Sequence, residues 1–123
     1  MKASELRISN LVFHEDKGII RITANDIVEL SMSKFGLLQP IELSEEILLK
    51  CGFNKDNYDC LYLILNDKNN NVLWVKKQQN NFGIALNMFH LEKETVYLND
   101  LNFLHQLQNL IHALTNEELT VNL

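Results

Sequence analysis

A chain of 123 residues is long enough for one hydrophobic core and short for two, so we expect a single domain spanning residues 1–123. Hydrophobic residues make up 46% of the chain, which predicts a packed globule rather than a disordered segment. The formal net charge is −5, from 11 basic and 16 acidic residues. This balance argues against direct binding to nucleic acid, because phosphate binding needs clustered Lys and Arg.

No apolar run approaches the roughly 18–20 residues that cross a bilayer. The first ten residues, MKASELRISN, lack the apolar core of a signal peptide. We therefore expect no membrane association and a cytoplasmic location.

The N-terminal region is predicted to form a β-hairpin. Residues 6–13 have the composition of an opening strand, which Ser9 and Asn10 could interrupt as a bulge. The Asp-Lys-Gly sequence at 16–18 supplies turn chemistry, and three isoleucines within residues 19–22 indicate the returning strand.

Two short helices are predicted next. Thr23, Asn25 and Asp26 can open the first, with Ile27, Val28 and Leu30 expected at its buried positions. Residues 40–53 contain the second helix, which Ser44 would cap and Gly52 would end. Its inward positions would be Ile47, Leu48 and Cys51. Neighbouring Glu45 and Glu46 favour a helix start and not an acid–base pair, since adjacent helix residues point about 100° apart.

Residues 58–98 are predicted to form an antiparallel β region with short polar turns. Its four strands are expected at 60–65, 72–75, 82–89 and 95–98. One face of such a sheet would lie on the helices, and the other would stay partly solvated.

Residues 99–121 hold the clearest helix pattern in the chain. Asn99 or Asp100 could cap its start, and Asn116 tolerates the left-handed conformation in which helices often end. Alternation in residues 119–123 predicts a short terminal strand. The helix stripe consists of apolar residues at three- and four-residue steps: Leu101, Leu104, Leu107, Leu110, Ile111 and Leu114.

These elements predict an α+β fold. It would contain an antiparallel sheet of about four to six strands with an N-terminal hairpin. Two short helices and one longer C-terminal helix would pack on one face of the sheet.

Neither the cysteines nor the histidines form a metal signature. Cys51 and Cys60 lack a CxxC spacing, so we interpret both as small buried apolar residues. His105 and His112 share a helix face, but Gln108 between them is a poor zinc ligand. The two histidines and Gln108 are instead expected at the polar border of the apolar stripe.

The sequence contains no nucleophile elbow and no glycine-rich phosphate loop. We therefore expect no enzymatic activity, no catalytic residue, no metal and no cofactor. A basic and aromatic group formed by Trp74, Lys76, Lys77 and Phe82 suggests a single-strand nucleic-acid binder. Two lysines are few against a net negative charge, and a mid-strand Trp74 is expected in the core.

Charge is distributed unevenly along the chain. Lys93 is the last basic residue, and four acidic residues follow it: Glu94, Asp100, Glu117 and Glu118. Such a segment is compatible with docking on a basic partner, because complementary potentials steer association. An ordinary solvated acidic surface is the alternative. The candidate partner-binding residues are these four and the Asn-rich turn of Asn69, Asn70 and Asn71.

Four blocks of sequence carry a family resemblance: LRISNLV (6–12), TANDI (23–27), QPIELSEEILLKCGF (39–53) and LHQLQNLIHALTNEEL (104–119). They resemble a family of small proteins from bacterial prophages and related mobile elements. Its hallmark is a C-terminal HQLQNLxxALTxEEL string preceded by a PIxLxEExLLKxGF segment. The resemblance covers about a third of the chain.

The chain departs from the family at three positions. It carries Ser9 and Asn116 where members tend to have glycine, and Cys51 where phenylalanine is common. These departures touch turns and core, and the family supplies no catalytic residue. Its hallmark polar residues suit hydrogen bonds that tie helix to sheet: His105, Gln106, Gln108 and Asn109.

The resemblance implies an accessory function in the cytoplasm of a bacterial host. As a small, acidic chain without catalytic motifs, it is similar to anti-CRISPR inhibitors of type VI-B RNA-guided RNA nucleases. The expected partner is the nuclease with its guide RNA, and the expected effect is perturbed guide loading or target access. Two alternatives stay open: a phage replication or regulatory factor that binds another protein, and a small enzyme with an unrecognised site.

Overall fold

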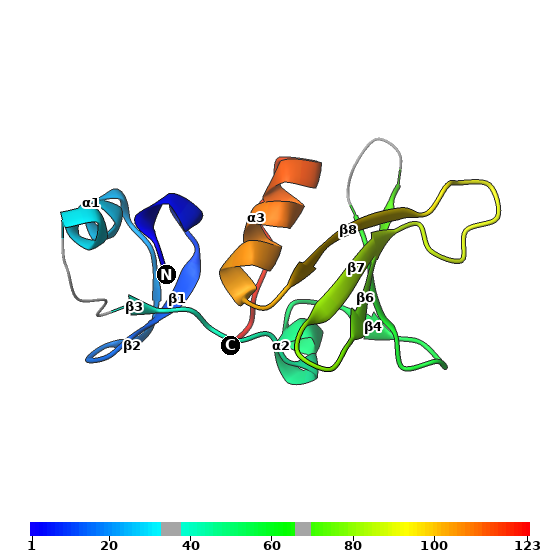
Figure 1. Ribbon diagram of the computed structural model, residues 1–123, viewed down its shortest axis with the longest axis horizontal. Coiled ribbons are helices and arrows are strands. Elements are labelled where there is room, and N and C mark those ends of the chain that lie inside the picture. The colour runs from blue at the N-terminus through cyan, green and yellow to red at the C-terminus, as the bar shows by residue number, and fades with distance from the viewer. Residues whose placement is uncertain (33–37, 66–69) are drawn as a thin grey trace. The chain divides into compact units, whose positions relative to one another are not determined.

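The computed structural model describes residues 1–32, 38–65 and 70–123 (Figure 1). The described chain has an α+β fold, as predicted. It divides into two compact units, which we describe separately. Unit 1 comprises Met1–Glu42 and Phe103–Leu110, and unit 2 comprises Leu43–Asn102 and Ile111–Leu123. The single domain over residues 1–123 stays a prediction.

Unit 1 contains a small antiparallel sheet. The predicted hairpin is present as β1 (Leu11–His14) and β2 (Gly18–Arg21), and β3 (Leu38–Gln39) pairs with the other side of β1. The 3-10 helix η1 (Ala3–Glu5) precedes β1. The predicted strand at residues 6–13 begins only at Leu11, because Ser9, expected as a bulge within it, has a φ of 78° and lies in a turn before the strand.

The helix α1 (Ala24–Met32) begins where Thr23 and Asp26 satisfy each other's backbone groups. The Thr23 N–H donates to the Asp26 carboxylate at 2.9 Å, and this bond is the main cause that lowers the pKa of Asp26. The predicted burial of Ile27, Val28 and Leu30 is wrong, since α1 has no buried residue and Val28 is 53% exposed. Among the described elements, the most extensive contact of α1 is with the short η1, which is too small to cover an apolar stripe.

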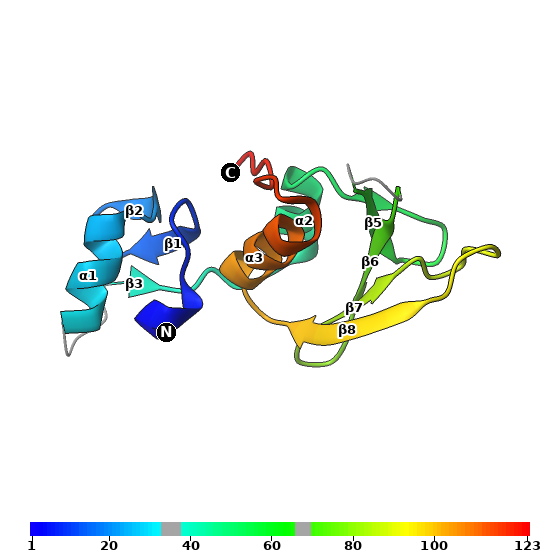
Figure 2. The same ribbon diagram turned by 90° about the horizontal axis from the view of Figure 1, so that it is seen from above.

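Unit 2 is built on a five-stranded antiparallel sheet in the order β4-β5-β6-β7-β8. The strands are β4 (Asn54–Lys55), β5 (Leu61–Ile64), β6 (Val72–Lys77), β7 (Phe82–Leu86) and β8 (Val96–Leu101). Figure 2 shows α2 (Glu45–Lys50) on one side of this sheet. We call that side the inner face, and its buried side chains include Leu61, Leu73, Val75, Ile84 and Leu86.

Both predicted ends of α2 are confirmed. The Ser44 side chain accepts a hydrogen bond from the Ile47 N–H at 3.2 Å, which satisfies one free donor of the first turn. Gly52 follows the helix with a φ of 92°, a conformation that costs glycine little. Leu48 and Cys51 are buried, and Ile47 is half-buried.

The C-terminal helix α3 (Leu104–Thr115) starts later than its apolar pattern suggested. The prediction that Asn99 or Asp100 caps it is wrong, because both residues and Leu101 belong to β8. The chain turns after β8, and the Gln106 side chain accepts from the Phe103 N–H at 3.0 Å at the true start. Asn116 ends the helix with a φ of 59°, as expected.

The predicted terminal strand at residues 119–123 is absent; the described chain has no secondary structure there. Leu119 and Val121 are buried, so the alternation reflects burial without a sheet ladder. The Asn122 N–H donates instead to the Lys50 carbonyl at the end of α2, at 3.1 Å.

Two of the polar hallmark residues of α3 are more buried than expected for the border of its apolar stripe. His105 and Gln108 are fully buried in unit 1, which corrects their predicted position. The predicted ties from helix to sheet are present for Gln108 and Asn109. Gln108 accepts from the Leu11 N–H, and Asn109 accepts from the Asn10 side chain at 2.8 Å. No described helix has the length and apolar character that a membrane crossing requires.

Candidate functional site

The second side of the five-stranded sheet, which we call the outer face, carries a row of aromatic side chains. Strand registers place Tyr62 opposite Trp74, Trp74 opposite Ala85, and Ala85 opposite Tyr97. Because side chains directly opposite across a ladder share a face, these four residues form one row across β5, β6, β7 and β8.

Aromatic contacts extend this row beyond the strands. The Tyr62 and Trp74 ring centroids are 5.1 Å apart, and Phe89 meets Trp74 edge-on at 5.3 Å. Offset and edge-to-face contacts of this kind are favourable for aromatic rings. Tyr97 is nevertheless 78% exposed, Phe89 66% and Ile64 65%. The outer face therefore presents a broad aromatic and aliphatic surface to solvent.

The basic and aromatic group that the sequence suggested is split between the two faces. Trp74 and Lys76 point to the outer face, whereas Phe82 is 5% exposed and lies opposite Lys77 on the other face. Trp74 is half-buried on the outer face and not a core residue. Successive side chains of β6 point to opposite faces of the sheet. This alternation separates Lys76 from Lys77 and places Trp74 on the outer face.

A hollow of about 200 Å³ lies on the outer face beside this row. Its lining includes Trp74 and Lys76 from β6, Ala85 from β7, and Tyr97 and Asp100 from β8. Asp100 accepts a hydrogen bond from the Asn81 side chain at 3.2 Å. The hollow thus combines aromatic walls with one carboxylate and one ammonium group.

A second hollow of about 260 Å³ in unit 2 has a largely aliphatic lining that includes Leu63, Ile64 and Ile111. Glu117 and Glu118 also line it, and both residues are exposed. The Glu117 N–H donates to the Thr115 hydroxyl at 3.1 Å, so this acidic pair follows directly on the end of α3.

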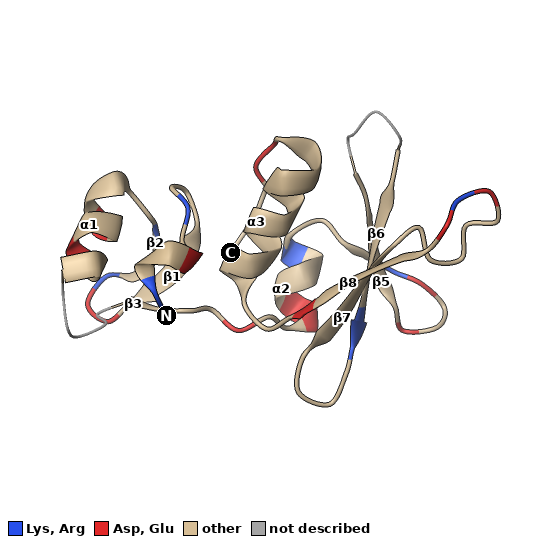
Figure 3. Ribbon diagram, turned by 45° about the horizontal axis from the view of Figure 1, so that its top comes forward, with Lys and Arg blue, Asp and Glu red and all other residues tan. Residues whose placement is uncertain are grey.

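The other predicted partner-binding residues are spread over several segments of unit 2. Figure 3 shows that the acidic residues of the described chain lie on separate elements. Glu94 precedes β8 and Asp100 lies near its end, so roughly 20 Å of extended chain separates them. Asn70 is exposed with a φ of 49°, and Asn71 accepts from the Asn87 side chain at 2.9 Å. Asn69 lies outside the described residues. Binding by this whole set stays a prediction.

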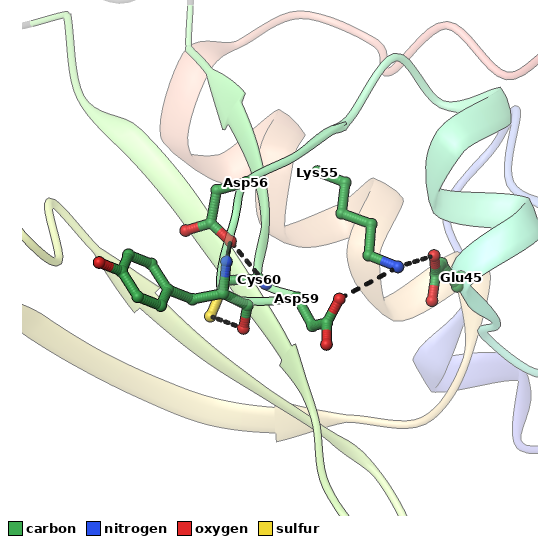
Figure 4. A network of polar contacts seen from close by, with 6 residues as sticks. Glu45, Lys55, Asp56, Asp59 and Cys60 are labelled. Atoms are coloured by element: carbon green, nitrogen blue, oxygen red, sulfur yellow. Dashed lines mark hydrogen bonds and ion pairs between the residues drawn. The ribbon is translucent and has the colours of Figure 1, made fainter.

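A polar network on unit 2 holds the start of the sheet against α2 (Figure 4). Lys55 Nζ lies 2.9 Å from Glu45 Oε1 and 3.3 Å from Asp59 Oδ1. The bond with Glu45 is the main cause that raises the pKa of Lys55, followed by the bond with Asp59. Sequence reasoning missed this pairing, because it depends on how the loop after α2 returns to the helix.

Asp56 and Cys60 belong to the same network and form a turn. Asp56 Oδ1 accepts from the backbone N–H groups of Tyr58 and Cys60, both at 2.9 Å, which is an Asx-type turn (Figure 4). Desolvation is the main cause that raises the pKa of Cys60. Burial also raises the pKa of Cys51 to about 11. Both cysteines are free and buried, as predicted.

Among residues 1–32, 38–65 and 70–123, no three His, Cys, Asp or Glu side chains lie close enough together to hold a metal ion. Comparison with known proteins found no matching family model, no matching curated protein and no matching solved structure. The family resemblance of the four sequence blocks therefore stays a prediction. The outer face and its hollow are the surface features of unit 2 that suit the binding of a partner.

Proposed function

We propose that this chain is a non-enzymatic, phage-type accessory protein that acts by binding another protein. The proposed target is an RNA-guided RNA-targeting nuclease of the type VI-B class, and the proposed effect is perturbed guide RNA loading or target access. The resemblance of the four sequence blocks supports the choice of target. The outer face of the five-stranded sheet supports action by protein binding.

The observation that carries the proposal is the exposure of apolar and aromatic side chains together on one face. Single exposed apolar residues are ordinary, but contiguous exposed patches mark interaction sites. Tyr62, Ile64, Trp74, Phe89 and Tyr97 lie on or beside this face. Aromatic residues are enriched in protein interfaces and dominate their binding energy.

Charge supports the choice of a basic partner. The chain has a net charge of −5, and the four acidic residues from Glu94 onward contribute −4 with no basic residue among them. RNA-guided nucleases hold nucleic acid in positively charged channels. A negative protein is steered toward such a surface, and the association rate falls as salt screens the attraction.

A cleavage assay with a purified type VI-B nuclease tests the proposal. The nuclease is loaded with guide RNA before or after the chain is added, and target RNA cleavage is measured across a range of chain-to-nuclease ratios. A binding inhibitor should reach full effect near one chain per nuclease. Full effect at a ratio far below one would indicate an enzyme instead, and no effect in either order of addition would refute the proposed target.

Pull-down from host lysate distinguishes the other alternative. Recovery of the guide-loaded nuclease supports inhibition. Specific recovery of a replication or regulatory protein, without the nuclease, would replace the proposed target with the accessory-factor alternative.

Charge neutralisation tests the electrostatic part separately. The fourfold variant Glu94→Gln, Asp100→Asn, Glu117→Gln and Glu118→Gln should bind the nuclease about tenfold more weakly at low salt. The matched control neutralises four exposed acids of unit 1 with the same change in net charge: Glu15, Asp16, Glu29 and Glu42. Equal affinities for the two fourfold variants would contradict a role for the C-terminal acidic residues.

A further inference from the structure

The hollow on the outer face has the form of a slot along β7. Ala85 and Gly83 occupy successive outward positions of β7. The Gln78 side chain lies over Gly83, with its amide nitrogen 2.6 Å from the point where a Cβ would sit, so Ala85 and the Gln78 amide form the floor of the slot. Trp74 and Lys76 on β6 lie opposite Ala85 and Gly83. A slot rather than a flat surface results because the two smallest residues of this face follow one another on the same strand.

The second wall of the slot comes from β8. Tyr97 lies opposite Ala85. Beyond it the register advances from Leu98 to Leu101 on β8 while β7 moves only from Ile84 to Phe82, which indicates a bulge. Asp100 Oδ1 then lies 3.7 Å from the point where a Cβ on Gly83 would sit. The bulge therefore places a carboxylate at the floor of the slot.

Trp74 and Tyr97 stand two strands apart, so the backbones that carry them are roughly 10 Å apart. Ala85 itself is only 4% exposed, so the room for a planar group is the hollow of about 200 Å³ beside it, where such a group would contact an aromatic wall. At the next position along the slot, such a group would meet the carboxylate of Asp100. A planar group that carries a positive charge could contact both the aromatic wall and the carboxylate.

We propose that this slot binds one arginine side chain of a protein partner. The guanidinium group is planar, stacks on aromatic faces and donates two parallel hydrogen bonds to a carboxylate. Trp74 and Tyr97 provide the aromatic faces, and Asp100 provides the carboxylate. The arginine slot rests on the proposed function only for the identity of the partner. The slot itself specifies how a basic partner would be bound.

Charge favours arginine over a nucleobase. A nucleotide would also stack on Trp74 and Tyr97, and Lys76 could meet one phosphate. The net charge of −5 and the carboxylate at the slot floor oppose a phosphate backbone, however. Lys76 lies across Gly83 from Asp100 and repels any cation, so the single carboxylate of Asp100 can offset the charge of one arginine but not that of a polybasic cluster.

A titration of the isotope-labelled full chain by NMR tests the slot without the nuclease. The probe is the peptide acetyl-Gly-Arg-Gly-amide, and the comparison peptides carry lysine or uncharged citrulline in place of arginine. Amide signals of Gly83, Ala85 and Tyr97 should shift, and the fluorescence of Trp74, the sole tryptophan, should change. The arginine peptide should bind about tenfold more tightly than either comparison peptide.

Three variants localise the binding. Tyr97→Ala removes an exposed wall, Asp100→Asn removes the charge, and Gly83→Ala adds a methyl group that pushes the Gln78 amide into the slot. Gly83 does not have a positive φ, and a methyl group there would meet the Gln78 amide at 2.6 Å, at the far end of a flexible side chain. Each variant should therefore stay folded and lose at least about fivefold in affinity for the arginine peptide.

Matched controls lie elsewhere on unit 2. Tyr58→Ala removes a tyrosine that is 81% exposed, close to the value for Tyr97, and Glu92→Gln removes an exposed charge in the turn before β8. Both should bind the arginine peptide as the unchanged chain does. Equal losses in the control and slot variants would overturn the assignment.

The outcomes for the slot and for the proposed function are separable. Absence of peptide-induced shifts at about 20 mM, above the affinity range of a single stacked ion pair, would overturn the arginine slot while the nuclease assay stands alone. Tighter binding of hexauridylate RNA than of the arginine peptide would also overturn it, in favour of a base-stacking site. Peptide binding without nuclease inhibition would keep the slot and refute the proposed target.

Discussion

The side-chain oxygen of Gln108 accepts a hydrogen bond from the backbone N–H of Leu11 at 2.8 Å, across 97 positions of sequence. Both residues are buried, so water does not compete for this donor. The neighbouring Asn109 makes a parallel contact with the Asn10 side chain. Unit 1 therefore joins the start of α3 to β1 through side-chain amides, which replace the ladder bonds that a further strand would have made.

Replacing Gln108 with methionine should destabilise the protein by about 1–3 kcal/mol, because the Leu11 N–H would be buried without an acceptor. Methionine keeps the length and approximate volume of the side chain. Chemical denaturation monitored by circular dichroism measures the change. Gln79→Met, at an exposed position between β6 and β7, is the control and should change stability by less than about 0.5 kcal/mol. Equal stability of the two variants would contradict the role assigned to Gln108.

His105 makes the stability of the protein depend on pH. Its ring stacks on Phe103 at 5.8 Å, and neither ring nitrogen has a hydrogen-bond partner among the described residues. Burial is the main cause that lowers its pKa from 6.5, and the nearby Glu5 opposes this effect. The unfolded chain therefore binds this proton more readily, so the contribution of His105 to stability should be constant above about pH 6.5 and fall as pH drops below it.

The variant His105→Leu isolates this contribution. It should reduce the slope of unfolding free energy between about pH 5 and pH 6.5, and it should cost little at pH 8 because no hydrogen bond is lost. His90→Leu, which replaces an exposed histidine, should keep the slope. A slope that is unchanged in His105→Leu would show that other groups govern the pH dependence.

The sequence predicted well those features that depend on neighbouring residues. Ser44, Gly52 and Asn116 mark helix ends because capping and positive φ are local properties. The predicted start of α3 was wrong because Leu101 continues the helical spacing of apolar residues, although it is the last residue of β8. Periodicity alone cannot separate a strand that ends in leucine from the first turn of a helix.

The slot on the outer face could not be predicted in the same way. It depends on which residues of β6, β7 and β8 stand opposite one another, and register is set by pairing across the whole sheet. Asp100 appeared in the sequence only as one of several acidic residues. The bulge after Leu98 gives it a distinct position beside Gly83, and no residue pattern within β8 indicates that bulge.

The two thiols should be protected in the folded protein. Cys51 has a pKa raised to about 11 by burial, and the pKa of Cys60 is also raised, so little reactive thiolate is present at pH 8. Reaction with a thiol-specific disulfide reagent should occur only at the rate of unfolding, and fully in denaturant. The variant Tyr58→Cys, at an exposed position, should react rapidly with one added equivalent. Fast labelling of the unchanged protein would contradict the burial of its cysteines.

Glycine at either of two left-handed positions should stabilise the fold. Ser9 has a φ of 78° and Asn116 a φ of 59°, and this region costs residues with a Cβ more than it costs glycine. Ser9→Gly should add about 1 kcal/mol to the unfolding free energy, and Asn116→Gly a few tenths, since asparagine tolerates the region better than serine. Backbone bonds at both sites survive the change, because the Ser9 N–H donates to the Ile22 carbonyl and the Asn116 N–H to the His112 carbonyl. The matched control Ser31→Gly lies within α1 and should lower stability by about 0.5–1 kcal/mol. A loss of stability in Ser9→Gly would show that the serine side chain contributes more to the turn before β1 than its backbone conformation costs.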